Sequence, residues 1–317
     1  MSVFTPLRRD ELEAFLAPYG LGRLHEFQGI ASGTENSNFF VSLERGEYVL
    51  TLVERGPGEA LPFMIELLDV LHRAGLPVPY AIRSEDGEPL GELAEKPALL
   101  QPRLPGHHVA APNPHHCAEV GRFLARLHLA TGEQTLERSS DRGLDWMQEQ
   151  GPSLALGLPD NQLELLREAL AEIAERRPRL LALPRADLHA DLFRDNVLFE
   201  GNHLSGVIDF YNACSGPMLY DLAIAVNDWC SHPNGELDHQ RVEPLLAAYS
   251  SLRRFTPAEA ELWPTMLRVA CLRFWLSRLI AQQQFAGQAE VQVKDPDEFC
   301  RLLAARQQPD CPLPFAF

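Results

Sequence analysis

The chain has 317 residues, of which 45% are hydrophobic and 23% charged, and its formal net charge is −16. This size suits a globular protein with two lobes and a sizeable core, and the acidity argues against nucleic acid or an anionic membrane as the main partner. No stretch approaches the roughly 18 apolar residues of a membrane span, and the N-terminus lacks a signal-peptide core, so we expect a cytoplasmic protein. Six widely spaced cysteines without a C-x-x-C pair favour free thiols over zinc.

The first hundred residues alternate between short strand-forming runs and two helices. The first helix is expected over residues 5–16, because a threonine followed by proline commonly begins a helix. The second is expected over 62–74, where Gly75 ends the apolar pattern. Runs rich in β-branched and aromatic residues indicate the strands. These expected strands cover residues 24–30, 39–43, 48–53 and 98–102.

Beyond Leu104-Pro105-Gly106, which we interpret as a hinge, the chain becomes mainly helical. Apolar residues recur at helical spacing after Asn113-Pro114, around 163–173 and over 262–279. Two short strands at 197–199 and 204–208 flank a tight turn. The pattern predicts an α+β, bilobal fold. A small β-rich lobe would cover residues 1–103 and a larger, mainly helical lobe residues 104–317, with the ligand cleft between the lobes.

The segment from His189 to Asn196, followed by Asp209 at the end of the next expected strand, carries the chemistry. Asp191 and Asn196 are five residues apart, which matches the catalytic loop of kinases. We expect Asp191 to face the nucleophilic hydroxyl, and Asn196 and Asp209 to bind the Mg²⁺ ions that accompany ATP. His189 is expected to hold the loop by hydrogen bonds rather than to transfer protons.

Additional groups around the phosphates have two interpretations each. Arg194, inside the loop, either adds charge at the γ-phosphate or pairs with a neighbouring carboxylate. A polar loop at 31–38 lies between two expected strands, where kinases place a phosphate-covering loop, but it contains a single glycine. It is either that loop or an ordinary polar hairpin. Its candidate ATP-binding residues are Ser32, Gly33, Thr34 and Asn36.

Residues 189–196 resemble the catalytic loop of the aminoglycoside-phosphotransferase and choline-kinase superfamily, and the segment 216–223 resembles the sequence that follows its metal-binding aspartate. Further stretches are similar to bacterial homoserine kinases of that superfamily. The resemblance implies a protein-kinase-like fold and ATP- and Mg²⁺-dependent phosphorylation of the side-chain hydroxyl of L-homoserine to O-phospho-L-homoserine, a step toward threonine. The similar stretches are 33–38, 48–52, 208–214, 226–230, 272–279 and 295–299.

The sequence departs from the wider kinase pattern at two positions. Thr51 occupies the strand position where a phosphate-pairing lysine is expected, and the chain has only two lysines, Lys96 and Lys294. Lys96, Arg194 or the metal would then neutralise the α- and β-phosphates. Asp195 stands where many superfamily members have glycine, and it is either a carboxylate that supports the metal or an ordinary loop residue.

L-Homoserine is a zwitterion, so the resemblance implies a pocket with an anionic side chain for its ammonium group. The pocket would also need a guanidinium that donates two parallel hydrogen bonds to its carboxylate. Asp228 suits the first task, and Arg273 or Arg278 on the long helix suits the second. Tyr211 and Trp275 would form walls of the pocket. The alternative for each of these side chains is packing or solvation.

Two other functions remain open from the sequence. One is a kinase of another small hydroxylated substrate, such as choline, an aminoglycoside or methylthioribose. With 8% aromatic residues no cage for a quaternary ammonium stands out, whereas the acidity suits a polycation. The other is a non-catalytic nucleotide-binding module, which Thr51 supports. The intact set of Asp191, Asn196 and Asp209 argues against that module.

Overall fold

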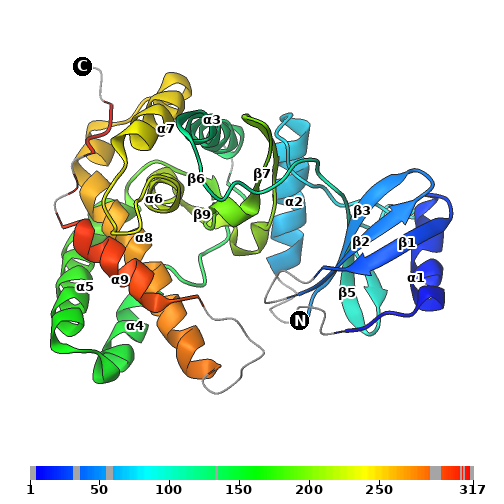
Figure 1. Cartoon of the computed structure of the whole chain (residues 1–317), viewed down its shortest axis with the longest axis horizontal. Coiled ribbons are helices and arrows are strands. Elements are labelled where there is room, and N and C mark those ends of the chain that lie inside the picture. The colour runs from blue at the N-terminus through cyan, green and yellow to red at the C-terminus, as the bar shows by residue number, and fades with distance from the viewer. Residues whose placement is uncertain are drawn as a thin grey trace. The chain divides into compact units, whose positions relative to one another are not determined.

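A computed structural model describes residues 5–30, 36–54, 60–132, 135–285, 294–307, 309 and 311–314. The chain divides into two compact units, and Figure 1 labels most of their helices and strands. Unit 1 comprises Met1–Gly106 together with Gly206–Tyr211, and unit 2 comprises His107–Ser205 together with Asn212–Phe317. The mixture of a strand-rich unit 1 and a mainly helical unit 2 confirms the predicted α+β class.

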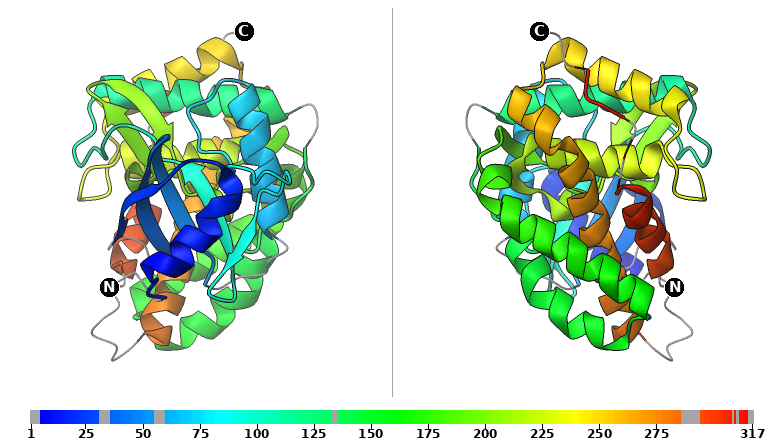
Figure 2. Two further views of the ribbon diagram at one scale, coloured as in Figure 1. Left: turned by 90° about the vertical axis from the view of Figure 1, so that its right-hand side faces the viewer. Right: turned by 90° about the vertical axis from the view of Figure 1, so that its left-hand side faces the viewer.

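Unit 1 is built on a five-stranded antiparallel sheet in the order β1-β2-β3-β5-β4. The helix α1 lies against one face of this sheet (Figure 2), and apolar side chains of both fill the space between them. The elements of unit 1 are α1 (Arg9–Leu16), β1 (Leu24–Gly29), β2 (Ser37–Leu43), β3 (Gly46–Leu52), α2 (Ala60–Arg73), β4 (Gly91–Leu93) and β5 (Lys96–Pro102).

Alternation along the central strands sets which side chains face α1. Leu50 and Leu52 of β3 pack in the core with Leu12 of α1. Because successive strand residues point to opposite faces, Thr51 faces away from α1. Its partners across the sheet, Asn38 and Leu99, share that second face.

The first helix begins later than the sequence predicts. It starts at Arg9, and the carboxylate of Glu11 accepts a hydrogen bond from the Arg8 N–H (3.1 Å) at its N-terminus. Thr5 is tied to the sheet instead, because its N–H donates to Ser37 Oγ (3.0 Å) and its hydroxyl accepts from the Lys96 ammonium. Tertiary hydrogen bonds therefore override the local Thr-Pro helix signal.

Unit 2 is organised around α8, a long helix whose middle is buried on nearly all sides. From Leu262 to Leu276 most of its own side chains are apolar and buried, whichever side of the helix they lie on. This is expected for a helix at the centre of a helical domain. The helices α4, α5 and α9 pack along it (Figures 1 and 2). The helices are α3 (Pro114–Thr131), α4 (Leu144–Leu154), α5 (Asp160–Leu181), α6 (Met218–Trp229), α7 (His239–Leu252), α8 (Pro257–Gln284) and α9 (Pro296–Ala305).

Two small strand pairs flank the segment that carries the chemistry. The expected hairpin is present as β7 (Val197–Glu200) and β8 (His203–Val207). The sequence analysis did not find the second pair, β6 (Arg185–Leu188) and β9 (Cys214–Pro217), which run antiparallel with Leu188 opposite Cys214. Each has four residues, and β9 contains glycine and proline, so neither gave a strand signal. Their pairing places the start of the catalytic loop beside the residues that precede β9.

Among the described helices, none is both long and apolar enough to cross a membrane.

Candidate active site

The catalytic loop follows β6 and is held by a buried carboxylate from α6. Asp221 accepts hydrogen bonds from the N–H groups of His189 (2.8 Å) and Ala190 (2.7 Å). Ala190 has φ +61°, a conformation that costs an L-residue about 1–3 kcal/mol and persists only where its surroundings fix it. The two hydrogen bonds to the Asp221 carboxylate hold Ala190 in this conformation. Asp191 is the next residue after the bend that they fix.

His189 lies in the interior beneath this loop. Its side chain is fully buried, and its Nδ1 accepts a hydrogen bond from the Asp191 N–H (3.2 Å). A group so placed supports the loop backbone and has no exposed nitrogen with which to exchange protons with a substrate.

The Asp191 carboxylate is 18% exposed and belongs to a three-residue polar cluster. Its Oδ2 accepts a hydrogen bond from Asn212 Nδ2 (3.1 Å), and its Oδ1 lies 3.9 Å from Arg273 Nη1. Arg273 Nη2 in turn donates to Asn212 Oδ1 (3.2 Å). The structure thus brings together the predicted Asp191 and Arg273, from positions 82 apart in the sequence, with a side chain that the sequence analysis missed.

Asn212 was missed because nothing in its immediate sequence marks it. It lies in a turn just before β9, and its closeness to Asp191 depends on the β6–β9 pairing. Its position three residues after Asp209, inside a stretch that resembles homoserine kinases, was the available signal.

Asn196 is buried and oriented by the same loop. Its Nδ2 donates to the Asp191 carbonyl oxygen (2.8 Å), which fixes the amide so that Oδ1 is the atom available to a ligand. An amide oxygen is a hard ligand of the type that Mg²⁺ prefers. Asn196 Oδ1 and the Asp209 carboxylate are each of the oxygen type that suits a magnesium ion. Asp209 belongs to the segment of unit 1 and has φ +66°.

Arg194 and Asp228 form an ion pair within unit 2. The Asp228 carboxylate accepts from the Arg194 N–H (2.8 Å), Nε (3.2 Å) and Nη2 (3.3 Å). Burial raises the pKa of Asp228, and Arg194 opposes that rise. These contacts favour the ion-pair alternative for Arg194. They argue against Asp228 as the anchor of a substrate ammonium, because its two oxygens already hold the catalytic loop.

The remaining predicted substrate residues differ in what they can contact. Trp275 is 0% exposed and packs in the core, so the structure argues against it as a pocket wall. Arg278 bonds the Glu298 carboxylate (2.5 Å) and the Asp295 carbonyl (2.8 Å), which joins α8 to the start of α9. Of the two arginines considered for the substrate carboxylate, Arg273 is therefore the one beside Asp191.

Tyr211 and Thr51 lie together in unit 1. The Thr51 hydroxyl donates to Asn38 Oδ1 (2.7 Å), and burial raises the pKa of the Tyr211 phenol, which is close to Thr51. Asn36 is also buried, and its Oδ1 accepts from the Glu54 N–H (3.2 Å). The other predicted ATP-binding residues, Ser32, Gly33 and Thr34, lie outside the described residues.

Lys96 does not take the place of the missing strand lysine. On β5 it is two residues from Ala98, which packs in the core with α1, so it points to the face opposite Thr51. Its ammonium pairs with Glu54. The geometry removes Lys96 from the three groups considered for the α- and β-phosphates, and Arg194 is engaged by Asp228.

Asp195 forms an exposed ion pair with Lys294 (2.8 Å), whose side chains are 57% and 59% exposed. The Lys294 ammonium also lies 5.5 Å from the centre of the Phe193 ring. Asp195 is thus a surface residue of the loop in this structure, which matches the second of its two interpretations.

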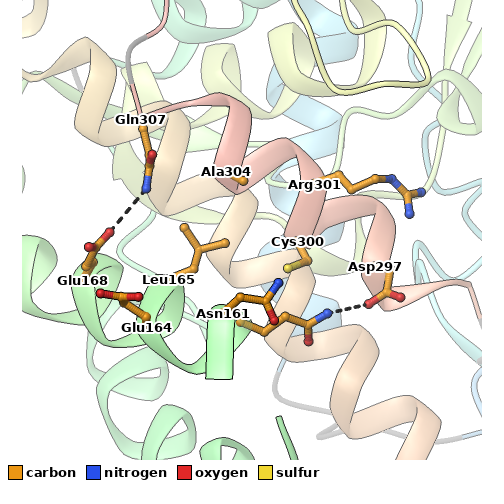
Figure 3. A pocket seen from close by; sticks show the side chains of 10 residues that line it. Asn161, Glu164, Leu165, Glu168, Asp297, Cys300, Arg301, Ala304 and Gln307 are labelled. Carbon is orange, nitrogen blue, oxygen red and sulfur yellow. Dashed lines mark hydrogen bonds between the residues drawn. The ribbon is translucent and has the colours of Figure 1, made fainter. Parts of the chain in front are cut away.

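A depression of about 450 Å³ lies between α5 and α9, on unit 2 (Figure 3). Hydrogen bonds bridge its rim, from Gln162 to Asp297 (3.2 Å) and from Gln307 to Glu168 (3.3 Å). None of the predicted site residues lines it, so it is separate from the cluster around Asp191.

Comparison with known proteins places this site in a family. The model of the phosphotransferase enzyme family matches residues 26–261. A homoserine kinase of Pseudomonas aeruginosa (strain LESB58) is 66% identical over 316 residues, covering 100% of both chains. A homoserine kinase of Methylobacillus flagellatus is 44% identical over 313 residues, covering 97% of both chains.

Solved structures share the fold at low sequence identity. The amicoumacin kinase hAmiN, in complex with AMP-PNP, Ca²⁺ and Ami, has a TM-score of 0.67 at 18% identity and covers 98% of both chains. The microcompartment-associated aminopropanol kinase has a TM-score of 0.68 at 17% identity and covers 93% of both chains. These likenesses confirm the predicted kinase-like fold. Together with the sequence relatives and the catalytic loop, they establish that the chain belongs to the phosphotransferase enzyme family, in the branch formed by its bacterial homoserine kinase relatives.

Proposed function

We propose that this protein transfers the γ-phosphoryl group of ATP to the side-chain hydroxyl of L-homoserine, giving O-phospho-L-homoserine on the route to threonine. The observation that carries the proposal is the pairing of Asp191, a carboxylate on a kinase catalytic loop, with the buried guanidinium of Arg273 at 3.9 Å. The two full-length homoserine kinase relatives support the same substrate.

Asp191 acts mainly by position. Phosphoryl transfer passes through a loose transition state in which the attacking oxygen gains little charge early. A carboxylate is a weak base toward an alcohol, so its task is to accept a hydrogen bond from the substrate hydroxyl, aim that oxygen at the γ-phosphorus and take the proton late. The fixed loop described above suits that task, because Asp221 holds the backbone that leads into Asp191, and His189 and Asn196 bond the N–H and the carbonyl of Asp191 itself.

Mg²⁺ is the metal that the donor atoms fit. Asn196 and Asp209 would hold it, as the motif predicts, and when bound it would compensate the charge of the ATP phosphates. Asn196 is prepared for this role because its amide nitrogen is used by the loop carbonyl. With Lys96 on the other face of the sheet and Arg194 paired with Asp228, an ion held by Asn196 and Asp209 would supply the larger share of phosphate neutralisation.

Arg273 is proposed to bind the carboxylate of the amino-acid substrate. Its side chain is 5% exposed, lies 3.9 Å from Asp191, donates a hydrogen bond to Asn212 and lies over the Phe274 ring at 3.8 Å. A guanidinium has five N–H donors, so it retains donors for a carboxylate in the fork geometry that favours arginine.

The same residue argues against the alternative acceptors. Choline and aminoglycosides are cationic, and a buried arginine beside the catalytic carboxylate would repel them. Methylthioribose lacks a carboxylate and would leave the guanidinium without its partner. A non-catalytic nucleotide-binding module would have no need of a positioned Asp191.

The test is ADP release from Mg·ATP with L-homoserine, choline, kanamycin, methylthioribose, L-serine or no acceptor. We expect homoserine to be strongly preferred. Preference for another acceptor would overturn the substrate assignment and keep the kinase chemistry, whereas absence of turnover with every acceptor would contradict the proposal as a whole.

A further inference from the structure

The Asp191–Arg273 contact is indirect, which is unusual for a buried guanidinium beside a largely enclosed carboxylate. Their closest atoms are 3.9 Å apart, beyond hydrogen-bond distance, although an arginine and a carboxylate normally form two parallel hydrogen bonds. The amide of Asn212 bonds both partners instead: its Nδ2 to Asp191 Oδ2 at 3.1 Å and its Oδ1 to Arg273 Nη2 at 3.2 Å.

The orientation of this amide is determined by its neighbours. A guanidinium can only donate and an ionised carboxylate can only accept. The amide oxygen must therefore face Arg273 and the amide nitrogen must face Asp191. The reversed amide would set donor against donor and acceptor against acceptor.

We infer that Asn212 is a positioning residue that holds Arg273 and Asp191 apart. It occupies one oxygen of Asp191 and one nitrogen of Arg273, and it leaves Asp191 Oδ1 and the other guanidinium donors for ligands. If the proposed function is right, these ligands are the hydroxyl and the carboxylate of one amino-acid substrate. A direct two-bond ion pair would consume both groups and block the reaction.

The backbone that carries Asn212 is well anchored. The residue directly after it, Ala213, accepts a hydrogen bond from Arg138 at its carbonyl oxygen. In β9 the Ser215 N–H donates to the Arg138 carbonyl (2.7 Å), and the Ser215 hydroxyl donates to the buried Asp187 (2.5 Å). A site residue that must fix two charged neighbours needs such support, since small displacements are costly at catalytic groups.

The test compares Asn212→Leu, which keeps the approximate volume and removes both hydrogen bonds, with wild type. We expect kcat to fall roughly tenfold to a hundredfold and KM for the amino acid to rise about tenfold, as Arg273 closes on Asp191. KM for ATP and the melting temperature should stay near the wild-type values. A fall in melting temperature with unchanged kcat and KM would show a merely structural role and overturn the inference.

A double-mutant cycle identifies the partner. If Asn212 acts by holding Arg273 away, the pair Asn212→Leu/Arg273→Gln should lose no more kcat/KM than Arg273→Gln by itself, because no cation remains to collapse onto Asp191. Additive losses would overturn the inference. If the leucine variant does not fold, Asn212→Asp replaces it. This variant keeps the size, pairs with Arg273 and repels Asp191, so kcat should again fall at least tenfold, and unchanged kcat would contradict the mechanism.

These outcomes are separable from the proposed function. Substrate identity is decided on the wild-type protein with the acceptor panel, and the Asn212 variants are then compared with wild type on whichever acceptor that panel selects.

Discussion

His128 on α3 contacts Asp221 on α6, with Nε2 3.3 Å from Oδ2, and both side chains are completely inaccessible to solvent. On its other side His128 meets the Tyr249 hydroxyl (Nδ1–Oη 2.8 Å), which links α7 into the same network. Since Asp221 also receives the N–H groups of His189 and Ala190, the catalytic loop is anchored to three helices of unit 2 through one carboxylate.

Asp221→Asn should destabilise the protein and slow the reaction together. The amide nitrogen cannot accept, so a buried N–H of the loop loses its partner, at about 1–3 kcal/mol, and the strained Ala190 loses support. Chemical denaturation should show that loss, and kcat should fall at least tenfold. Wild-type unfolding free energy and kcat in this variant would contradict the anchoring role.

Asp191→Asn should remove turnover without loss of stability. The side chain is partly exposed and keeps its shape, while the amide is a much poorer acceptor for the substrate hydroxyl. We expect kcat to fall about a thousandfold with an unchanged melting temperature. Asp195→Asn is the matched control, because it makes the same change four residues away in an exposed ion pair, and its kcat should stay within about twofold of wild type.

Arg273→Leu should weaken binding of the amino acid far more than binding of ATP. Loss of a charge-assisted fork to a carboxylate costs about 2–4 kcal/mol, equivalent to roughly 30- to 1,000-fold in kcat/KM. Arg278→Leu provides the control on the same helix, since Arg278 pairs with Glu298. Equal effects of the two substitutions on KM for homoserine would contradict the role of Arg273.

Lys96→Met should leave KM for ATP unchanged, because Lys96 faces away from Thr51. It should lower stability by about 1–2 kcal/mol, since Glu54 loses a partly buried partner. A large rise in KM for ATP would contradict this placement and indicate that Lys96 binds the ATP phosphates.

The stability effect of Lys96→Met should depend on pH. Burial raises the pKa of Glu54, but hydrogen bonds from Lys96 and Ser37 outweigh burial and lower it below its ordinary value of 4.5. A lowered carboxylate pKa stabilises the folded state above the unfolded pKa, and that contribution disappears as pH falls through the folded value. Denaturation at pH 7 and pH 3 should therefore show a larger difference between wild type and Lys96→Met at pH 7. An equal difference at both pH values would contradict the pairing.

The parts of this protein that depend on neighbours in the chain were predictable from its sequence. The β-forming composition of β2 and β3 and the 3.6-residue periodicity of α8 are local patterns, and each led to the right element. The spacing of Asp191 and Asn196 is also local, and it led to the predicted kinase loop. The start of α3 was also predictable from the sequence, because Asn113 caps the helix. Its side chain accepts hydrogen bonds from the N–H groups of His115 and His116.

The tertiary structure decided which of several suitable side chains act together. Asp228 and Arg194 both suited ligand binding by charge, yet they lie close enough to pair with each other. Trp275 lies on the part of α8 that is buried on nearly all sides. Asn212 reaches Asp191 because two four-residue strands pair across 25 intervening residues, a contact that no local pattern encodes. The sequence by itself determined the chemistry, since side-chain types and loop spacing are local. Partners were decided by the fold, since burial and distance between remote residues arise only when the chain is packed.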